Sequence, residues 1–185
     1  MTHELGLELT CNSKVGWAFS LSRSRSCIHA TVTCRKACYG NGVRYQSNAQ
    51  KAKRERNFRT VEFLLDRGGP DLLAQNLIAL VDQARPRDWL AAQISGTLTA
   101  VPWTLRIHDV GDAHSVRYVK AWTITVRQRP LCRFWLYTHS FCEPELLAAL
   151  SELVSLPNCQ GFLSIDSNNF EAGLRAFAAY PGVWK

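Results

Sequence analysis

Short apolar runs alternate with helical stripes of apolar residues through the second half of the chain. The apolar runs predict strands at residues 103–108, 132–138 and 159–166. The stripes predict helices at residues 114–128, 143–154 and 169–180. Continuously apolar strands are typical of parallel sheets buried on both faces, and strands that alternate with helices form βα units with right-handed crossovers. This half of the chain is therefore expected to be a parallel α/β structure.

The first half has a less regular pattern. Residues 15–22 mix β-branched and aromatic residues and predict a strand, which a cysteine-bearing loop follows. A helix is expected over 47–66, basic in its first half and apolar at helical spacing in its second. Gly68-Gly69-Pro70 is expected to end it, and Asp71 to begin a second helix. Residues 87–102 show no clear pattern.

Together these patterns predict four βα units, with a fifth strand beginning at Val183-Trp184. A closed eight-unit barrel needs about 250 residues, so a chain of 185 residues is expected to form a partial barrel or an open, mostly parallel sheet. It is expected to be C-terminally short compared with longer relatives. We expect one α/β domain over residues 1–185, made of three parts that span 1–46, 47–101 and 102–185.

Composition narrows the class of protein. No apolar run is long enough to span a bilayer, and the N-terminus lacks the basic and apolar regions of a secretory signal, so a cytoplasmic protein without membrane contact is expected. Thiols stay reduced in that compartment, and an odd count of seven cysteines argues against a disulfide framework. Clustered cysteines then indicate metal binding or redox chemistry.

Three cysteines, Cys27, Cys34 and Cys38, fall within twelve residues at the spacing C-x6-C-x3-C. Thiolates are the usual ligands of iron–sulfur clusters and of structural zinc. Three ligands on one loop suit a cubane cluster that leaves one iron open to a small molecule. His29, within the loop, is a candidate to replace one of these ligands. The candidates for a fourth ligand are Cys11, Cys142 and Cys159. As an alternative, Cys132 and Cys159 lie at strand starts and are expected to be buried as small apolar groups.

Polar residues follow several of the predicted strands. In parallel α/β folds ligands bind beyond the carboxyl ends of the strands, which puts His108, Gly111 and Asp112 at the expected binding edge. A glycine lets a ligand approach the backbone closely, and Asp112 suits an amine or ribose hydroxyls. The alternative is an ordinary turn glycine followed by an aspartate that favours a helix N-terminus. No Gly-x-Ser-x-Gly elbow, phosphate-binding loop or His-Glu-x-x-His motif is present.

The net charge of +7 is unevenly distributed. Residues 1–60 hold eleven Lys and Arg against three Asp and Glu, whereas residues 61–185 are nearly balanced. Such a basic segment attracts nucleic acid or another anion, although it also suits a solvated helix face. The candidate nucleic-acid contacts are Lys51, Lys53, Arg54, Arg56 and Arg59. A protein partner from the host or the phage is a third alternative.

Several segments resemble the gene-product-88-like proteins of phages and plasmids. The resemblance rests on the opening NSKVGWAFSLSRSRSCIHATVTCRKACYG, the helix RYQSNAQKAKRERNF, the segment LRIHDVGDAHSVRYVKAW, the strand end FWLYTHS and the block LLAALSELVSLPNCQGFLSID. The order of these segments is similar to that of a radical-SAM partial barrel, although C-x6-C-x3-C differs from the superfamily's C-x3-C-x2-C.

The resemblance implies that Cys27, Cys34 and Cys38 hold a [4Fe–4S] cluster, with S-adenosylmethionine on the open iron. Asp112 would contact its amine, and the residues expected around the cofactor are His108, Gly111, Asp112, Ser164 and Asp166. The expected function is that of an iron–sulfur protein of a phage or mobile element, with radical-SAM-like enzyme activity on an unknown substrate. The alternative is a nucleic-acid-binding accessory protein with a structural zinc or cluster site.

Overall fold

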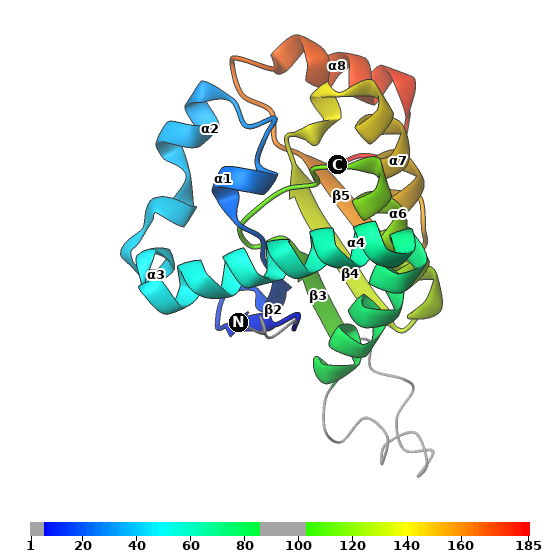
Figure 1. The fold of residues 1–185 in the computed structure, drawn as a ribbon. Helices are drawn as coiled ribbons and strands as arrows, with labels where there is room; N and C mark the ends of the chain where they lie inside the picture. Colours follow the sequence, from blue (N-terminus) through cyan, green and yellow to red (C-terminus); the bar gives the residue numbers. More distant parts are fainter. Residues whose placement is uncertain (1–5, 86–102) are drawn as a thin grey trace.

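A five-stranded sheet forms the centre of the molecule, in a computed structural model that describes residues 6–85 and 103–185 (Figure 1). The strands follow the order of the chain: β1 (Leu9–Asn12), β2 (Gly16–Phe19), β3 (Trp103–Ile107), β4 (Cys132–Thr138) and β5 (Cys159–Leu163). β1 pairs antiparallel with β2, and the remaining pairs are parallel. The prediction of an open, mostly parallel sheet with four βα units is therefore confirmed for the described residues.

Three helices cover one face of the sheet. α4 (Asn48–Gln83), α6 (Val116–Gln128) and α7 (Pro144–Val154) pack side by side, and α8 (Phe170–Ala179) follows β5 (Figure 1). β3, β4 and β5 are each followed by a helix, as the apolar periodicity predicts. Ser115 caps α6 by accepting a hydrogen bond from the Tyr118 N–H, which fixes where that helix begins.

The two helices expected around Gly68-Gly69-Pro70 belong to one long element, α4, with a break inside it. Gly68 and Gly69 leave the helical conformation, and Gly69 has a φ of 69°, which glycine adopts without strain. Pro70 lacks the N–H that a continuous helix would need. The glycines and the proline therefore change the direction of the chain, and α4 continues after them.

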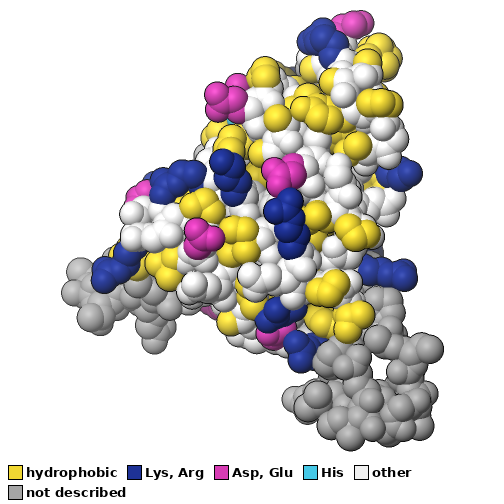
Figure 2. Space-filling model, turned by 90° about the vertical axis from the view of Figure 1, so that its right-hand side faces the viewer, with side chains coloured by type: hydrophobic (Ala, Val, Ile, Leu, Met, Phe, Trp, Pro, Cys, Tyr) yellow, Lys and Arg dark blue, Asp and Glu magenta, His cyan; other side chains and the backbone are white. Residues whose placement is uncertain are grey.

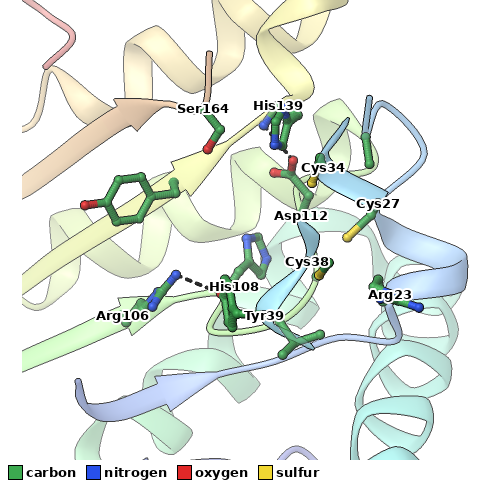
Figure 3. A pocket seen from close by; sticks show the side chains of 14 residues that line it. Arg23, Cys27, Cys34, Cys38, Tyr39, Arg106, His108, Asp112, His139 and Ser164 are labelled. Atoms are coloured by element: carbon green, nitrogen blue, oxygen red, sulfur yellow. Dashed lines mark hydrogen bonds between the residues drawn. The ribbon is translucent and has the colours of Figure 1, made fainter. Parts of the chain in front are cut away.

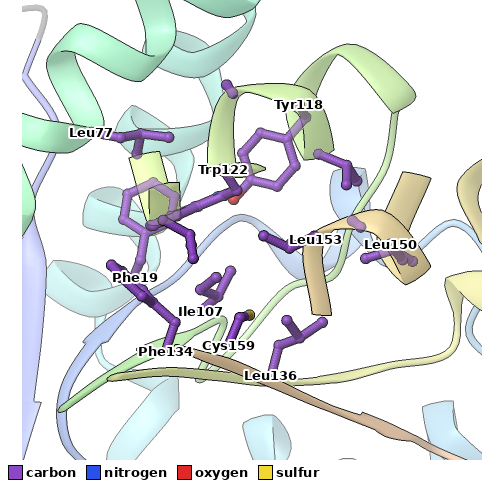
Figure 4. Close-up of a cluster of buried hydrophobic side chains, with 14 of the residues drawn as sticks. Phe19, Leu77, Ile107, Tyr118, Trp122, Phe134, Leu136, Leu150, Leu153 and Cys159 are labelled. Atoms are coloured by element: carbon purple, nitrogen blue, oxygen red, sulfur yellow. The ribbon is translucent and has the colours of Figure 1, made fainter. Parts of the chain in front are cut away.

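The core lies between the helices and the sheet. Phe19 and Phe134 from the strands meet Trp122 of α6 edge to face, with ring centroids 5.7 and 6.3 Å apart (Figure 4). Trp122 is 1% exposed, and Leu77 of α4 packs in the same cluster. Edge-to-face aromatic pairs add to the apolar burial that stabilises such a core.

Two expectations from the sequence are wrong. The segment after β2 is not a plain loop but a series of short helices: α1 (Arg23–Ser26), α2 (Val32–Ala37), a 3₁₀ turn η1 (Tyr39–Asn41) and α3 (Val43–Gln46). Val183-Trp184 does not begin a strand. Trp184 instead packs against Gly161, where an added Cβ would lie 2.6 Å from the indole, and its Nε1 donates to Ser151 Oγ at 3.1 Å.

The tryptophan at the centre of the core gives a stability prediction. We expect Trp122→Ala to lower the free energy of unfolding by about 3–5 kcal/mol, because a large buried ring leaves a cavity that its neighbours fill only in part. Phe170→Ala, at a side chain that is 54% exposed, should change it by less than about 0.5 kcal/mol. Urea unfolding followed by far-ultraviolet circular dichroism measures both; equal effects would contradict the assigned core.

Candidate functional site

A cavity of about 310 Å³ opens at the carboxyl ends of the parallel strands, between β3, β4 and the segment from α1 to η1 (Figure 3). We call it the cysteine cavity. It is lined by Arg23, Cys27, Ala30, Cys34, Cys38, Tyr39, Arg106, His108, Val110, Gly111, Asp112, Tyr137, His139 and Ser164. All three clustered cysteines and four of the five other predicted cofactor residues thus meet in one place, at the edge of the sheet where parallel α/β folds bind ligands.

The three clustered cysteines lie together on one wall of this cavity. Cys27 follows α1, Cys34 lies in α2 and Cys38 follows α2, and their sulfur atoms lie near one another in Figure 3. They also line a second cavity, of about 220 Å³. All seven cysteines are free thiols. The local helices explain the arrangement, because Thr31 caps α2 by accepting a hydrogen bond from Cys34 N–H at 2.9 Å.

The surroundings of these thiols disfavour an isolated thiolate. Burial, followed by the nearby charges of Asp112, Cys38 and Cys34, raises the pKa of Cys27 to about 12. The pKa of Cys34 is raised by burial and then by Cys38 and Asp112. At neutral pH both groups are therefore protonated in the metal-free protein. A cation bound among them would reverse this, because metal binding displaces thiol protons.

Hydrogen bonds hold the cysteine-bearing segment against the strand ends. Thr31 Oγ1 donates to Asp166, and Thr33 Oγ1 donates to Asn168 Oδ1 at 2.7 Å, which ties α2 to the loop after β5. Asp166, predicted to contact a cofactor, does not line the cavity. The Thr31 hydrogen bond lowers the pKa of Asp166, so this carboxylate stays charged as an acceptor for the segment.

A second attachment joins the segment to the end of β3. The Tyr39 hydroxyl donates to the carbonyl oxygen of Asp109 and accepts a hydrogen bond from Arg106 Nη2 at 2.9 Å. Arg106 also forms a buried ion pair with Asp109, at 3.2 Å between Nη1 and Oδ1. Tyr39 therefore links the thiol-bearing segment to a charged group on the sheet.

Gly111 and Asp112 occupy a crowded position after β3. Gly111 has a φ of 104°, and a Cβ there would lie 2.9 Å from both Leu21 Cβ and Ser26 Oγ. Leu21 and Ser26 thus leave no room for a side chain at residue 111. This crowding explains the glycine without a ligand. The alternative of a turn glycine accounts for this residue, which also lines the cavity; its contact with a ligand stays a prediction.

Asp112 is fully buried and has three protein partners. Its carboxylate accepts hydrogen bonds from Thr138 Oγ1 at 2.7 Å, His139 N–H at 2.8 Å and Ala113 N–H at 2.7 Å. Burial raises its pKa, which these hydrogen bonds counteract. Asp112 therefore joins the loop after β3 to the end of β4, a role that the sequence analysis did not anticipate.

His108 is the most strained residue of the wall. It has a φ of 66°, the one positive φ found among the described residues other than glycine. Its Nε2 lies 2.7 Å from the Tyr118 hydroxyl, and its Nδ1 has no hydrogen-bond partner among the described residues. Burial lowers the pKa of His108 to about 3, so its imidazole is neutral at physiological pH. Backbone strain of this kind is concentrated at functional sites.

Sequence reasoning missed Arg106 and Tyr137 as cavity residues. Arg106 lies inside β3 with its guanidinium 4.8 Å from the ring centre of Trp135 and 5.5 Å from that of Tyr137. The signal was present: a charged residue in an otherwise apolar buried strand is uncommon without a partner. It was missed because the strand was identified by its apolar residues alone.

The other candidate ligands and the basic helix residues lie elsewhere. His29, Cys11, Cys142 and Cys159 do not line the cysteine cavity, and Cys159 is buried in the core with Cys132, as expected for small apolar groups. Within residues 6–85 and 103–185 no group of three or more His, Cys, Asp or Glu side chains could hold a metal ion.

Ser164, by contrast, lines the cavity beside His139 (Figure 3).

Most of the basic side chains on α4 have partners in the protein. Lys53 and Arg56 pair with Glu8 at 3.4 and 2.5 Å, and Arg59 pairs with Glu55 at 3.0 Å. Arg54 is 6% exposed and donates to the Tyr45 carbonyl, whereas Lys51 is exposed. Figure 2 shows a different face, the right-hand side of Figure 1, where Lys and Arg side chains are interspersed with acidic and hydrophobic ones. The structure thus offers nucleic acid less free positive charge than the sequence suggests.

The fold and site define an α/β protein with a cysteine-lined cavity at its strand ends. The model of the family described as Gene product 88 matches residues 3–179, and the chain belongs to this family, as its motifs predict. The chain is similar to the Gene 88 protein of Mycobacterium phage L5, with 28% identity over 167 residues, which are 86% of this chain and 62% of that protein. It thus spans less than two thirds of that relative.

No solved structure matches the chain. Within the described residues no helix has both the length and the apolar character to cross a bilayer. The family match establishes the family, and the sheet topology establishes the open α/β fold.

The raised pKa of Cys27 gives a prediction for thiol reactivity. In metal-free protein at pH 8 we expect iodoacetamide to alkylate Cys27 at least about tenfold more slowly than the exposed Cys11, because only the thiolate reacts. The Cys27 rate should continue to rise with pH through about 11, since its pKa is about 12. Peptide mapping by mass spectrometry measures both rates. Comparable rates at pH 8 would show that the thiol is not buried as described.

Proposed function

We propose that this protein binds a [4Fe–4S] cluster through Cys27, Cys34 and Cys38 and uses it as a radical-SAM-like enzyme. The observation that carries the proposal is the meeting of three free thiols on one wall of a cavity at the carboxyl ends of parallel strands. Thiolates are the protein ligands of iron–sulfur clusters. A structural zinc ion would require a fourth protein ligand, and the cysteines considered for that role, Cys11, Cys142 and Cys159, lie outside the cavity.

The three thiols suit a cluster by their chemistry, although in the described residues they are not already gathered as a group that could hold a metal ion. Burial and mutual repulsion keep Cys27 and Cys34 protonated in the metal-free protein, so three adjacent thiolates need a positively charged group among them. Arg23 and Arg35 line the smaller cavity beside the same thiols and favour the negative charge of a thiolate-ligated cluster. When bound, such a cluster supplies one-electron chemistry. Three protein ligands leave one iron accessible from the cavity.

The part of the cavity beside the thiols would take S-adenosylmethionine. Gly111, His108 and Ser164 line its walls between the thiols and the strand ends. Asp112 holds His139 and Thr138 in place through its three hydrogen bonds. We therefore propose that Asp112 positions the end of β4. Its carboxylate would also lie beside the amine of S-adenosylmethionine, as the family resemblance implies.

The proposal is tested by metal content after anaerobic purification and reconstitution. We expect about four iron and four sulfide per chain, with broad absorbance near 400 nm that S-adenosylmethionine perturbs. Cys34→Ala and Cys38→Ala should lose most of the iron, because each removes one of three ligands. Cys11→Ala and Cys132→Ala are matched controls at free thiols outside the cavity and should retain it.

Two results would contradict this proposal. Iron retained in full by both Cys34→Ala and Cys38→Ala would show that the cluster, if formed, has other ligands. Zinc at one ion per chain, with no iron taken up on reconstitution, would make the thiols a structural site. Circular dichroism of each variant separates loss of ligand from loss of fold.

A further inference from the structure

Two buried hydrogen-bond donors without partners line the cysteine cavity from neighbouring positions. Arg106 is 9% exposed and His108 is 3% exposed. Arg106 Nε and His108 Nδ1 have no hydrogen-bond partner among the described residues, although both side chains line the cavity. A buried polar group left without a partner costs about 1–3 kcal/mol, so each such group in a native structure needs an explanation.

The hydrogen bond to Tyr118 indicates which imidazole nitrogen carries the proton. Burial keeps His108 neutral and raises the pKa of Tyr118, so the phenol retains its hydrogen. The phenol then donates to His108 Nε2 across 2.7 Å, which leaves the single imidazole proton on Nδ1. His108 thus offers an N–H donor to the cavity.

Arg106 is fixed in position and offers a second donor. Its Nη1 is paired with Asp109, its Nη2 donates to the Tyr39 hydroxyl, and the rings of Tyr39 and Tyr137 lie 5.6 and 5.5 Å from the guanidinium carbon. Asp109 does not line the cavity. The guanidinium is therefore held rigidly while its Nε edge stays unpaired, a geometry that suits a planar or tetrahedral acid group.

Among the described residues no acceptor reaches these two donors. The carboxylate that lines the cavity, Asp112, already accepts three hydrogen bonds from Thr138, His139 and Ala113. The Tyr39 hydroxyl donates to the Asp109 carbonyl and accepts from Arg106. Asp109 already balances the charge of the guanidinium at its Nη1 edge, so what Arg106 Nε and His108 Nδ1 lack is acceptor atoms, which a ligand would supply.

We propose that Arg106 and His108 bind the acid group of the substrate, a carboxylate or a phosphate, with Tyr137 beside its adjoining part. Tyr137 is 44% exposed and offers an aromatic surface next to the guanidinium. The inference rests on the proposed function for the role of this molecule as a substrate. Binding itself needs no cluster, so it is measured on the metal-free protein and fails independently of cluster assembly.

The test uses two simple anions as probes, benzoate and inorganic phosphate. We expect at least one of them to bind wild-type protein saturably and to shift the side-chain ¹⁵N resonance of His108 Nδ1, measured by NMR. Saturation by benzoate alone identifies a carboxylate subsite, and saturation by phosphate alone identifies a phosphate subsite. The uncharged benzamide should bind at least about tenfold more weakly than benzoate, because it lacks the charge that Arg106 recognises. No saturable shift of His108 with either anion would overturn the proposal.

Arginine variants separate this subsite from general attraction of anions to a basic protein. Arg106→Gln should weaken binding of the active probe at least about tenfold. Arg133→Gln is the matched control, because Arg133 is an exposed arginine of β4 that does not line the cavity, and its binding should be unchanged. Equal weakening by both variants would overturn the proposal. If Arg106→Gln does not fold, the His108 resonance of the wild-type protein decides.

Discussion

The candidate site depends on how Gly111 and Asp112 are held between three parts of the chain. The absence of a side chain at Gly111 lets the loop after β3 pass against Leu21 and Ser26, at the base of the cysteine-bearing segment. The buried carboxylate of Asp112 then joins this loop to Thr138 and His139 at the end of β4. A buried carboxylate is tolerated only when its oxygens are well hydrogen-bonded, so these two contacts, with a third from Ala113 N–H, fix the geometry of the edge. Cys27 directly follows Ser26 and is positioned by the same contact.

The βα units could be predicted because their information is local. Apolar runs and helical stripes follow from the residues themselves, and β3, β4, β5, α6, α7 and α8 lie where the pattern puts them. β1 could not be found in this way, because its four residues show no apolar run and, of its described side chains, only Leu9 lies in the buried core. It becomes a strand by pairing antiparallel with β2, and Asn57 holds the preceding Glu8 through its backbone N–H and C=O. Trp184 has the apolar character of a strand residue, but its ring packs over Gly161, where the absence of a side chain leaves room for it.

The sequence predicted which residues form the candidate site better than it predicted the contacts between them. The rule that ligands bind beyond parallel strand ends placed the cysteines together with His108, Gly111, Asp112 and Ser164. It did not reveal that Asp166 would hold Thr31, or that Arg106 would project into the cavity from within β3. Both depend on pairings between distant residues. The basic first third shows the same limit, because Glu8 and Glu55 neutralise charges that look free in the sequence.

Thiol ligands and hydrogen-bond donors for an acid group lie in one cavity. The central claim is that three thiolates hold a cluster with one iron open to a small molecule. The most direct test is Mössbauer spectroscopy of protein reconstituted with ⁵⁷Fe, recorded before and after addition of S-adenosylmethionine. The account predicts a cubane spectrum in which one iron site changes on addition while the other three do not. A cubane whose iron sites all stay unchanged, or no cluster at all, would contradict it.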